Sequence, residues 1–333
     1  MRLKYVAAML RNARSYLGAP AIVMLVVACG ASERTGDARS AQTAKTSKTA
    51  SLFFSEVELA PGRTFPSPLV RGSVNGKPTI FVIDTGAQAS AVDATIAASA
   101  GLDLGREVKS SDPSGNAVEG MRTTERPHLL IDGLGLLAER PAVVMDFPPV
   151  MKTAGIGAIL SPQALTANGS EVVLDLSRRE LRIAGPNLES DAPATRPALA
   201  LGQIDVCRWT EGDVPAKALV MRASIDGKPV SLEVDTGASK TFIVADSDVG
   251  RMLATRPAAE RSRAVTAAGQ VDIVQVEGVT ARSGAVALDG AFSIMPGKKD
   301  ERCGYEGRLG IDRLKSCRLI LREASVTGTC SKD

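Results

Sequence analysis

The chain has 333 residues, of which 44% are hydrophobic and 23% are charged, and its formal net charge at pH 7 is +3. This length can form one large domain or two domains of about 140 residues each. The charge is too small to indicate nucleic-acid binding, and a single histidine, His128, excludes a histidine-rich metal site. No pair of cysteines has the spacing of zinc ligands, so we expect no metal and no cofactor.

The first 30 residues have the order of charged and apolar side chains that is typical of an export signal. Basic residues precede an apolar stretch at 21–29, which is too short to span a membrane comfortably. The stretch ends in Val-Val-Ala-Cys-Gly, which resembles the cleavage motif of bacterial lipoproteins. That resemblance implies a signal peptide over residues 1–28, a lipid on Cys29 and, because Gly30 follows, anchoring at the periplasmic face of the outer membrane. The alternative is a plain signal peptide with a chance cysteine.

Residues 29–51 are expected to form a disordered tether. The sequence from 31 to 50 contains no large apolar side chain, so it cannot bury enough apolar surface to offset the entropy of ordering. Such a tether would let an anchored domain stand away from the membrane surface.

From Leu52 onward, short apolar runs alternate with Gly, Pro, Asn and Asp, a pattern that predicts strands separated by turns. One stretch, Ala91–Leu102, has the composition of a short helix instead. The body of the chain is therefore expected to be mostly β.

Two similar stretches, 172–183 and 317–328, each predict a hairpin that closes one half of the chain. They indicate an N-terminal lobe over 52–190 and a C-terminal lobe over 191–333. The polar, proline-containing sequence at 184–198 reads as the linker.

An internal repeat connects the two lobes. The stretch VNGKPTIFVIDTGAQAS at 74–90 matches IDGKPVSLEVDTGASKT at 225–241 without a gap. Asp84 and Asp235 begin the two Asp-Thr-Gly-Ala sequences and occupy the same position in each copy. Each copy predicts a turn at Asn-Gly or Asp-Gly, then a strand, then a tight loop. One Asp-Thr-Gly is an ordinary turn sequence, but two at the same place in duplicated lobes indicate a shared function.

The two copies resemble the active-site loops of aspartic proteases, in particular the retropepsin-like group, in which Ala follows Asp-Thr-Gly. Retropepsins have one lobe per chain and dimerise, whereas pepsin-like enzymes fuse two lobes, as this chain does. The resemblance covers most of residues 55–328. It implies a bilobal fold of two duplicated β-barrel-like lobes with a central cleft, a monomer with an internal pseudo-dimer, and a peptide or protein substrate.

Asp84 and Asp235 would be the catalytic dyad. Hydrolysis of a peptide bond by water needs a base that activates the water and an acid that protonates the carbonyl oxygen and the leaving nitrogen. Two adjacent carboxyl groups that share one proton supply both, because like charges so close cannot both ionise cheaply. The pair titrates as a unit, so the sequence assigns neither role to one residue.

The residues after each aspartate have supporting roles in the family. The resemblance implies that the hydroxyls of Thr85 and Thr236 bond across to the opposite loop. Gly86 and Gly237 would permit backbone turns that a Cβ obstructs, with their amides facing the carboxylates.

Hairpins that could act as flaps over the dyad are predicted at 110–120 and 265–278. Each has a glycine, Gly115 or Gly269, at its potential turn. An ordinary β-hairpin is the alternative at both places.

The chain departs from the family pattern in two respects. The late apolar-apolar-Gly segment that supports the catalytic loop fits at Leu309–Gly310, but in the first lobe Ser161 stands where the family has Gly. Gln88 and Ser239 occupy a position where retropepsins often have a second aspartate. The contacts with substrate are therefore expected to differ.

The closing hairpins set a register for the cysteines. The stretch LDLSRRELRI puts the first turn between Arg178 and Arg179, and the alignment moves the second turn to Glu323–Ala324. Opposite residues of the second hairpin then have numbers that sum to 647 (323 + 324).

Export would place four cysteines in an oxidising compartment, where three pairings are possible. The residue numbers of Cys317 and Cys330 also add up to 647 (317 + 330), so we predict that the two cysteines face each other across the hairpin and form a disulfide. Cys207 with Cys303 follows by elimination. The rival pairings join Cys303 to Cys317 or to Cys330.

The sequence as a whole predicts a lipid-anchored aspartic endopeptidase. A binding module of the same fold, which holds peptides or envelope components without cutting them, is the alternative; intact Asp-Thr-Gly in both lobes favours the enzyme. The dependence of activity on pH should be bell-shaped, with its optimum on the acidic side of neutral. Ala87 and Ala238 cannot donate a hydroxyl to the carboxylates, which would shift the optimum toward neutrality.

Overall fold

The computed structural model describes residues 48–55, 58–60, 63–137, 141–184, 197–211 and 214–331. The predicted signal peptide, Cys29 and the tether up to residue 47 lie outside these residues, as does most of the predicted linker. The described residues belong to one compact unit. In the described ranges, no helix is long and apolar enough to cross a membrane.

The first lobe consists of short strands and short helices. They are β2 (Glu58–Ala60), β3 (Arg63–Thr64), β4 (Leu69–Val74), β5 (Lys77–Ile83), β6 (Ala91–Asp93), α1 (Ala94–Ser99), β7 (Ser110–Ser111), β8 (Ala117–Val118), β9 (Arg122–Thr124), β10 (Leu129–Ile131), β11 (Gly135–Leu136), β12 (Ala142–Met145), α2 (Pro149–Thr153), β13 (Ile156–Leu160) and the 3-10 helix η1 (Pro162–Gly169). Eight strands form one sheet in the order β11-β10-β4-β5-β13-β6-β12-β9. Two pairs, β5 with β13 and β6 with β12, are parallel.

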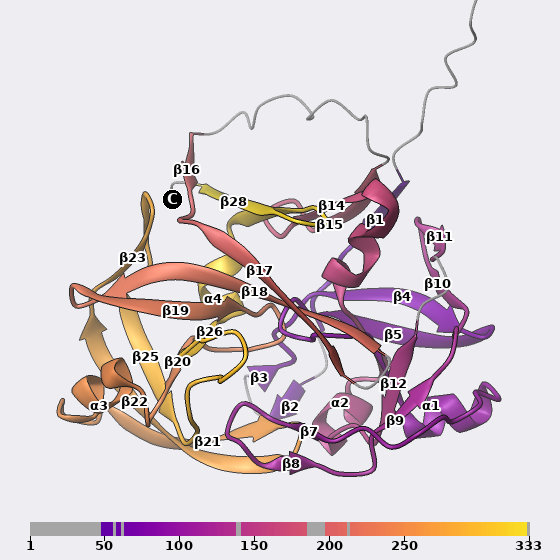
Figure 1. The fold of residues 1–333 in the computed structure, drawn as a ribbon, viewed down its shortest axis with the longest axis horizontal. Helices are drawn as coiled ribbons and strands as arrows, with labels where there is room; N and C mark the ends of the chain where they lie inside the picture. Colours follow the sequence, from indigo (N-terminus) through magenta and orange to yellow (C-terminus); the bar gives the residue numbers. More distant parts are fainter. Residues whose placement is uncertain are drawn as a thin grey trace, which may run out of the picture. The chain divides into compact units, whose positions relative to one another are not determined.

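The second lobe repeats this plan with longer strands. Its elements are β17 (Ile204–Glu211), β18 (Val214–Ile225), β19 (Lys228–Val234), β20 (Phe242–Val244), α3 (Asp248–Ala254), β21 (Glu260–Thr266), β22 (Gly269–Val279), β23 (Ala281–Ser283), β24 (Val286–Ala287), β25 (Gly290–Met295), β26 (Gly307–Leu309) and α4 (Ile311–Leu314). Again two pairs are parallel, β19 with β26 and β20 with β25. Figure 1 shows these elements in salmon, orange and yellow beside the purple and magenta first lobe.

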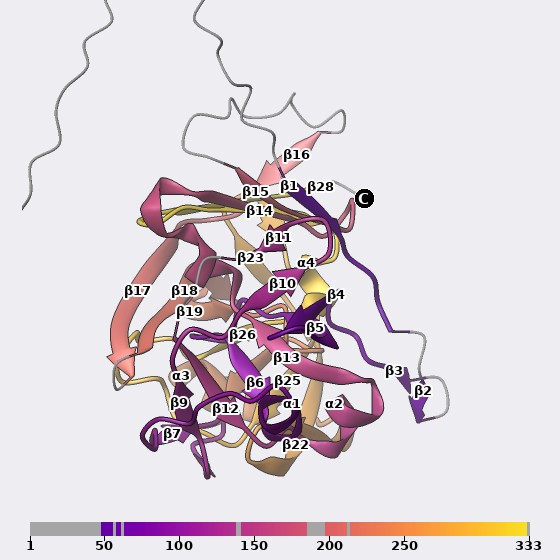
Figure 2. The same cartoon turned by 90° about the vertical axis from the view of Figure 1, so that its right-hand side faces the viewer.

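A sheet with strands from both halves of the chain joins the lobes. The strands at this junction are β1 (Lys48–Ser51), β14 (Glu171–Asp175), β15 (Glu180–Ala184), β16 (Ala198–Ala200), β27 (Cys317–Leu321) and β28 (Val326–Ser331). The same sheet continues from β28 through β17 into the strands of the second lobe. The junction is the antiparallel pair β14–β27, in which Val172 faces Leu321. Both side chains are fully buried, so the two halves share one core here. Figure 2 shows this layer together at the top of the view.

The turn before each Asp-Thr-Gly strand has the same backbone conformation in both lobes. Asn75 and Gly76 have φ values of 46° and 78°, and Asp226 and Gly227 have 49° and 79°. Two consecutive positive φ angles define the tight hairpin turn that Asn-Gly and Asp-Gly favour. The repeat therefore begins with the predicted turn in each copy.

Two predicted boundaries are wrong. Lys48–Ser51, expected to belong to the disordered tether, form a strand that pairs with β15, because Ala50 fits into the core beside Leu181. The helix expected over Ala91–Leu102 is shorter, because its first three residues extend the sheet as β6. Asp93 then caps α1 by accepting a hydrogen bond from the Thr95 amide.

The first closing hairpin turns one residue earlier than predicted. Paired residues of β14 and β15 sum to 355 (172 + 183), which centres the turn between Ser177 and Arg178. The Asp175 carboxylate causes this, because it accepts hydrogen bonds from the Ser177 hydroxyl and the Arg178 amide.

The second closing hairpin has the predicted register, since Cys317 pairs with Cys330 and Leu321 with Val326. The predicted alignment places the second hairpin one residue too early relative to the first, and this error compensates for the first turn being predicted one residue too late. Both predicted disulfides are confirmed: Cys317–Cys330 has a Cα–Cα distance of 3.9 Å, and Cys207–Cys303 has one of 5.8 Å.

Both stretches considered as flaps form hairpins. In the first lobe, β7 pairs with β8 around Gly115. In the second lobe, β21 pairs with β22, and the turn contains Gly269. The tip of the first hairpin reaches the second lobe, because a Cβ placed on Gly297 would lie 2.6 Å from the Pro113 carbonyl oxygen.

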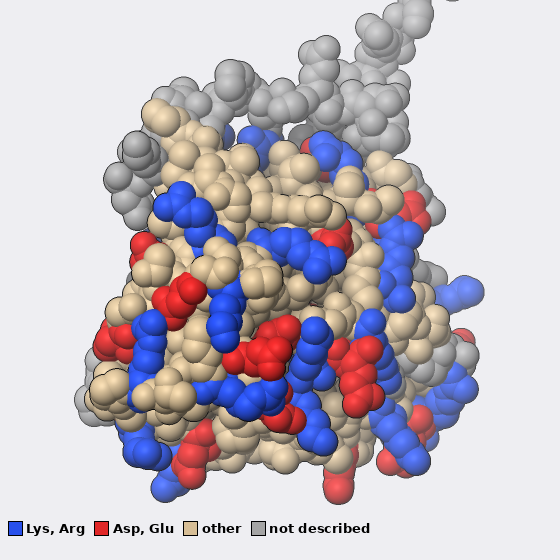
Figure 3. Space-filling model, turned by 60° about the vertical axis from the view of Figure 1, so that its left-hand side comes forward, with Lys and Arg blue, Asp and Glu red and all other residues tan. Residues whose placement is uncertain are grey.

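One face of the molecule carries charged side chains of both signs (Figure 3). On the face drawn in Figure 3, basic and acidic groups are interspersed, with tan areas between them. This face has no extended region of a single charge.

Candidate active site

The two Asp-Thr-Gly sequences begin where two equivalent strands end. Asp84 directly follows β5, and Asp235 directly follows β19. The amide of Asp84 donates to the Leu160 carbonyl over 3.0 Å, and that of Asp235 donates to the Leu309 carbonyl over 2.9 Å. Each strand is thus held by the parallel neighbour that also ends there. Ser161 in place of the family's glycine does not disturb this arrangement in the first lobe.

Thr85 and Thr236 join the two loops through hydrogen bonds. The Thr85 hydroxyl donates to the Val234 carbonyl over 2.7 Å, and the Thr236 hydroxyl donates to the Ile83 carbonyl over 2.6 Å. In return, each hydroxyl accepts a hydrogen bond from the amide of the opposite threonine, at 3.0 and 3.1 Å. All four bonds are buried and cross from one lobe to the other. They match the supporting role that the resemblance implies.

The glycines allow the two carboxylates to approach. A Cβ placed on Gly86 would lie 2.2 Å from Cγ of Asp235, and one placed on Gly237 would lie 2.5 Å from Cγ of Asp84. Each aspartate therefore packs against the glycine of the other lobe, where no side chain fits. The loops bring the two acids together although they belong to different halves of the sequence.

Backbone amides orient each carboxylate from its own loop. Oδ1 of Asp84 accepts from the amides of Gly86 and Ala87, at 2.8 and 3.0 Å. Oδ1 of Asp235 accepts from the amides of Gly237 and Ala238, at 2.8 and 2.9 Å. The Oδ2 atoms do not bond to these amides, and Oδ2 of Asp235 instead accepts a hydrogen bond from Nη1 of Arg308 over 2.6 Å.

The environment of the pair favours one proton on it. Burial, followed by the charge of Asp235, raises the pKa of Asp84 to about 8, although Arg308 and the Gly86 amide act in the opposite direction. Asp84 keeps some solvent exposure, whereas Asp235 is 2% exposed. An acid that stays protonated through neutrality can act as a proton donor there.

The comparison with protein families agrees with this geometry. Residues 70–138 match a gag-polyprotein putative aspartyl protease family, and residues 221–312 match an aspartyl protease family. Asp84 lies in the first matched range and Asp235 in the second. Each lobe therefore contains a region similar to retropepsin-like aspartyl protease domains, and we refer to the lobes as the first and second protease domains. A search of curated proteins finds no match to the chain.

The second protease domain contains a buried ion-pair cluster that the sequence prediction missed. Arg308 in β26 places Nη1 2.6 Å from Oδ2 of Asp235 and Nε 2.9 Å from Oε2 of Glu233. The side chains of Glu233 and Asp235 are at most 3% exposed, and that of Arg308 is 15% exposed. Comparison of the repeats could have indicated the cluster, since Glu233 and Arg308 replace apolar Val82 and Ile159 of the first domain.

Glu233 is less well paired than its distance from Arg308 suggests. Neither carboxyl oxygen of Glu233 has a hydrogen-bond donor among the described residues, so the Nε–H of Arg308 is close but poorly directed. Burial raises the pKa of Glu233 to about 8 and outweighs the opposing charge of Arg308. The directed hydrogen bond of the guanidinium is the one to Asp235.

Gln163 and Ser67 support the loops from outside the repeated motif. The Gln163 side-chain amide, on η1, donates to the carbonyls of Thr85 and Ala87 at 2.9 and 2.8 Å. Ser67 donates from its hydroxyl to the Gly237 carbonyl across the lobes. Both residues are almost completely buried. No motif in the sequence marks them, because their partners are backbone atoms far along the chain.

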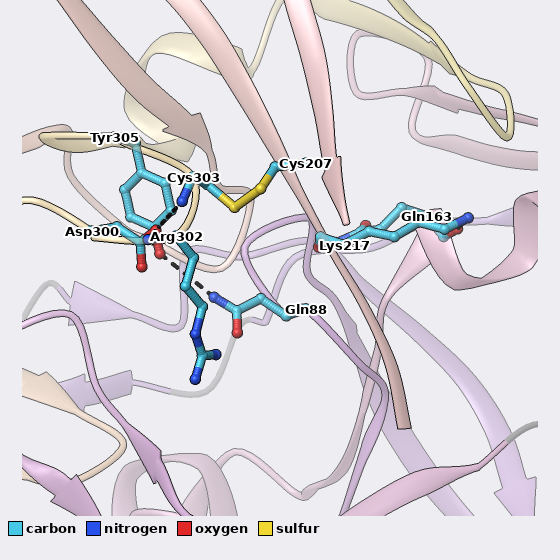
Figure 4. Close-up of a disulfide and its surroundings, with 8 residues drawn as sticks. All are labelled: Gln88, Gln163, Cys207, Lys217, Asp300, Arg302, Cys303 and Tyr305. Carbon is cyan, nitrogen blue, oxygen red and sulfur yellow. Dashed lines mark hydrogen bonds between the residues drawn. A yellow bond between two sulfur atoms is a disulfide. The ribbon is translucent and has the colours of Figure 1, made fainter. Parts of the chain in front are cut away.

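The hairpin β17–β18 of the second domain contacts the first Asp-Thr-Gly loop. The Lys217 amide donates to the Gln88 carbonyl over 3.1 Å. The Cys207–Cys303 disulfide ties this hairpin to the segment that holds Tyr305, whose hydroxyl lies 3.5 Å from Nε2 of Gln88 (Figure 4). Gln88, where retropepsins often have aspartate, is therefore engaged by the other domain.

A mainly apolar pocket lies beside the same loop. It is lined by residues of the first domain and by the start of β18, including Gln88, Leu137, Leu160, Leu165, Pro215 and Lys217.

Proposed function

We propose that the chain is an aspartic endopeptidase that hydrolyses peptide bonds with water activated by Asp84 and Asp235. The observation that carries the proposal is the pair of crossed loops, in which each carboxylate lies against the glycine of the other domain. The raised pKa of Asp84 supports it, because the pair then holds one proton at neutral pH.

In the proposed reaction, a water molecule between the Oδ2 atoms attacks the peptide carbonyl carbon. One of its protons goes to the ionised carboxylate, and the protonated carboxyl gives its proton to the carbonyl oxygen. The C–N bond of the resulting diol breaks as the leaving nitrogen takes a proton from the carboxyl that had accepted one from water. A hydroxyl of the diol returns a proton to the carboxylate that had protonated the carbonyl oxygen, which restores the starting state.

The test is cleavage of a diverse peptide library by the full chain across a range of pH. Asp84→Asn and Asp235→Asn should each lower kcat/KM by at least about 1,000-fold, because half a dyad lacks either the base or the shared proton. The matched control is Asp248→Asn, an exposed acid in α3, which should leave cleavage unchanged. A chelator should have no effect, and cleavage that survives in either dyad variant would rule out the proposed assignment.

A second candidate function is a peptide-binding module that does not cut. The ion pair between Arg308 and Asp235 favours it, because the guanidinium occupies one side of an oxygen that a lytic water would need. The same peptide library separates the two candidates: a module of this kind would retain intact peptides and would do so equally well in both Asn variants.

A further inference from the structure

The two protease domains differ at one pair of positions next to the dyad. In the first domain, Val82 of β5 pairs with Ile159 of β13, and both side chains are apolar. In the second domain, the equivalent pair is Glu233 with Arg308. Val82 and Glu233 are equivalent because each stands two positions before the aspartate of its own loop. The site is therefore symmetric in its loops and asymmetric in the charges beside them.

The asymmetry reaches the aspartates themselves. Oδ1 of Asp235 accepts two amides, and its Oδ2 accepts the Arg308 guanidinium at 2.6 Å. Asp84 accepts two amides on Oδ1, and no cation in the described ranges lies within ion-pair distance of it. A guanidinium is charged at every pH of interest and stabilises a carboxylate in contact with it.

We propose that Arg308 is a positioning residue that decides which aspartate carries the shared proton: it holds Asp235 as the carboxylate and leaves the proton on Asp84. The proposal rests on the proposed endopeptidase function. Asp235 is then the base that takes a proton from water, and Asp84 is the acid that protonates the peptide carbonyl. In a symmetric dyad the two roles could exchange between the residues.

The other groups around the cluster are consistent with this distribution. Glu233 faces Arg308 from β19, but burial raises its pKa to about 8, so below that pH it is mostly neutral and does not compete for the guanidinium charge. Tyr305 and Asp300 face the cluster from the segment before β26, and burial raises the pKa of Tyr305 as well. With the proton on Asp84 and Glu233 neutral, the group made of Arg308, Asp84, Asp235 and Glu233 carries one positive and one negative charge.

The matched variant is the double substitution Glu233→Val with Arg308→Ile, which copies the first-domain pair into the second domain. It removes Glu233 together with Arg308, so no buried glutamate is left beside an apolar residue, and Asp235 alone loses its cation. Arg308→Lys is the second variant, because it keeps the charge but loses the planar fork. Arg256→Gln, which breaks an ion pair with Asp226 elsewhere in the same domain, is the control.

The first measurement does not depend on activity. Carboxyl carbon NMR of the full chain, with signals assigned through Asp84→Asn and Asp235→Asn, reports the charge of each acid at pH 6. We expect a carboxylate signal for Asp235 and an acid signal for Asp84, and in the double variant a redistribution of the proton between them. Arg308→Lys should retain most of the wild-type pattern. Unchanged Asp235 and Asp84 signals in the folded double variant would overturn the inference.

The second measurement is the kinetics of peptide cleavage. The double variant should lose about 10- to 100-fold in kcat, with little change in KM, because the guanidinium acts on the charge of the dyad and not on the binding of peptide. The Arg256→Gln control should lose neither. If the wild type cleaves no peptide, the proposed function fails while the NMR result still decides the inference. If it cleaves and the double variant matches it in kcat, the inference alone fails.

Discussion

At the scale of single residues, two buried acids make stability depend on pH. The pKa of Asp84 is raised from 3.8 to about 8, and that of Glu233 from 4.5 to about 8, in each case mainly by burial. Between about pH 4 and pH 8 the folded chain therefore binds more protons than the unfolded chain. The free energy of unfolding contributed by these groups is fully present below pH 4 and falls as the pH rises toward 8.

This predicts that Asp84→Asn and Glu233→Gln flatten the dependence of stability on pH. Each amide stays neutral at every pH, so its contribution to the unfolding free energy does not change between pH 5 and pH 8. The difference in unfolding free energy between each variant and the wild type should therefore shift by at least about 1 kcal/mol in favour of the variant from pH 5 to pH 8, because a pKa shift of one unit already corresponds to about that much free energy. Urea unfolding midpoints of the full chain at the two pH values measure this difference.

The control is Asp93→Asn in the first domain. Burial would raise the pKa of Asp93, but hydrogen bonds from the Phe147 and Thr95 amides, with other contacts, lower it on balance. Asp93 is thus ionised in both states from pH 5 to pH 8, and its substitution should cost similar stability at both. An equal pH dependence in the wild type and both amide variants would show that Asp84 and Glu233 ionise normally.

The meeting of the two Asp-Thr-Gly loops could be predicted from sequence, because the same residues occur twice at equivalent positions of the repeat. Arg308 could not be found in the same way, since it stands where the family pattern expects an apolar residue and its partners come much earlier in the chain, in and just after another strand. Only parallel pairing of β19 with β26 brings Glu233 and Arg308 side by side. The repeat does contain the signal, but only as a difference between its two copies.

At the scale of elements, the crossed loops depend on two hydroxyl groups. Thr85→Val removes a donor to the Val234 carbonyl and an acceptor for the Thr236 amide while preserving the shape of the side chain. We expect a loss of about 2–4 kcal/mol in unfolding free energy, because two buried backbone groups lose their partner. Cleavage should fall by about 10- to 100-fold, since the carboxylates lose their alignment.

Thr85→Ser is the matched control for this substitution. It keeps the hydroxyl and should remain within about 1 kcal/mol of the wild type, with most of its activity. Unfolding midpoints and kcat for the two variants provide the test. If Val and Ser are equally tolerated, the crossed bonds do not hold the site.

Strand existence could be predicted better than strand limits. The alternation of apolar runs with turn residues indicated the β architecture, and the Asn-Gly and Asp-Gly turns have their expected backbone angles. The limits of β1 and β6 were missed because both are set by tertiary pairing, with β15 and β12, and not by local composition. The first closing turn was misplaced because a side chain, Asp175, decides it.

At the scale of the whole molecule, the chain is proposed to be held at a membrane through Cys29, which lies outside the described residues. This predicts that the mature protein begins at Cys29 and carries a lipid there. Intact mass measurement of protein from a bacterial membrane fraction checks both. Cys29→Ala should move the protein to the soluble fraction without altering the peptides it cleaves, and unlipidated wild-type protein would contradict the anchor.

The sheet shared by the lobes, in which β14 pairs with β27, has a consequence for how the protein can vary. Two loops within one chain meet at a local concentration that dilution does not lower, unlike loops contributed by separate subunits. A symmetric homodimer must also repeat every substitution on both sides of its axis. A guanidinium beside one aspartate would then stand beside the other as well. Covalent union removes that constraint, so each half of this site can change independently.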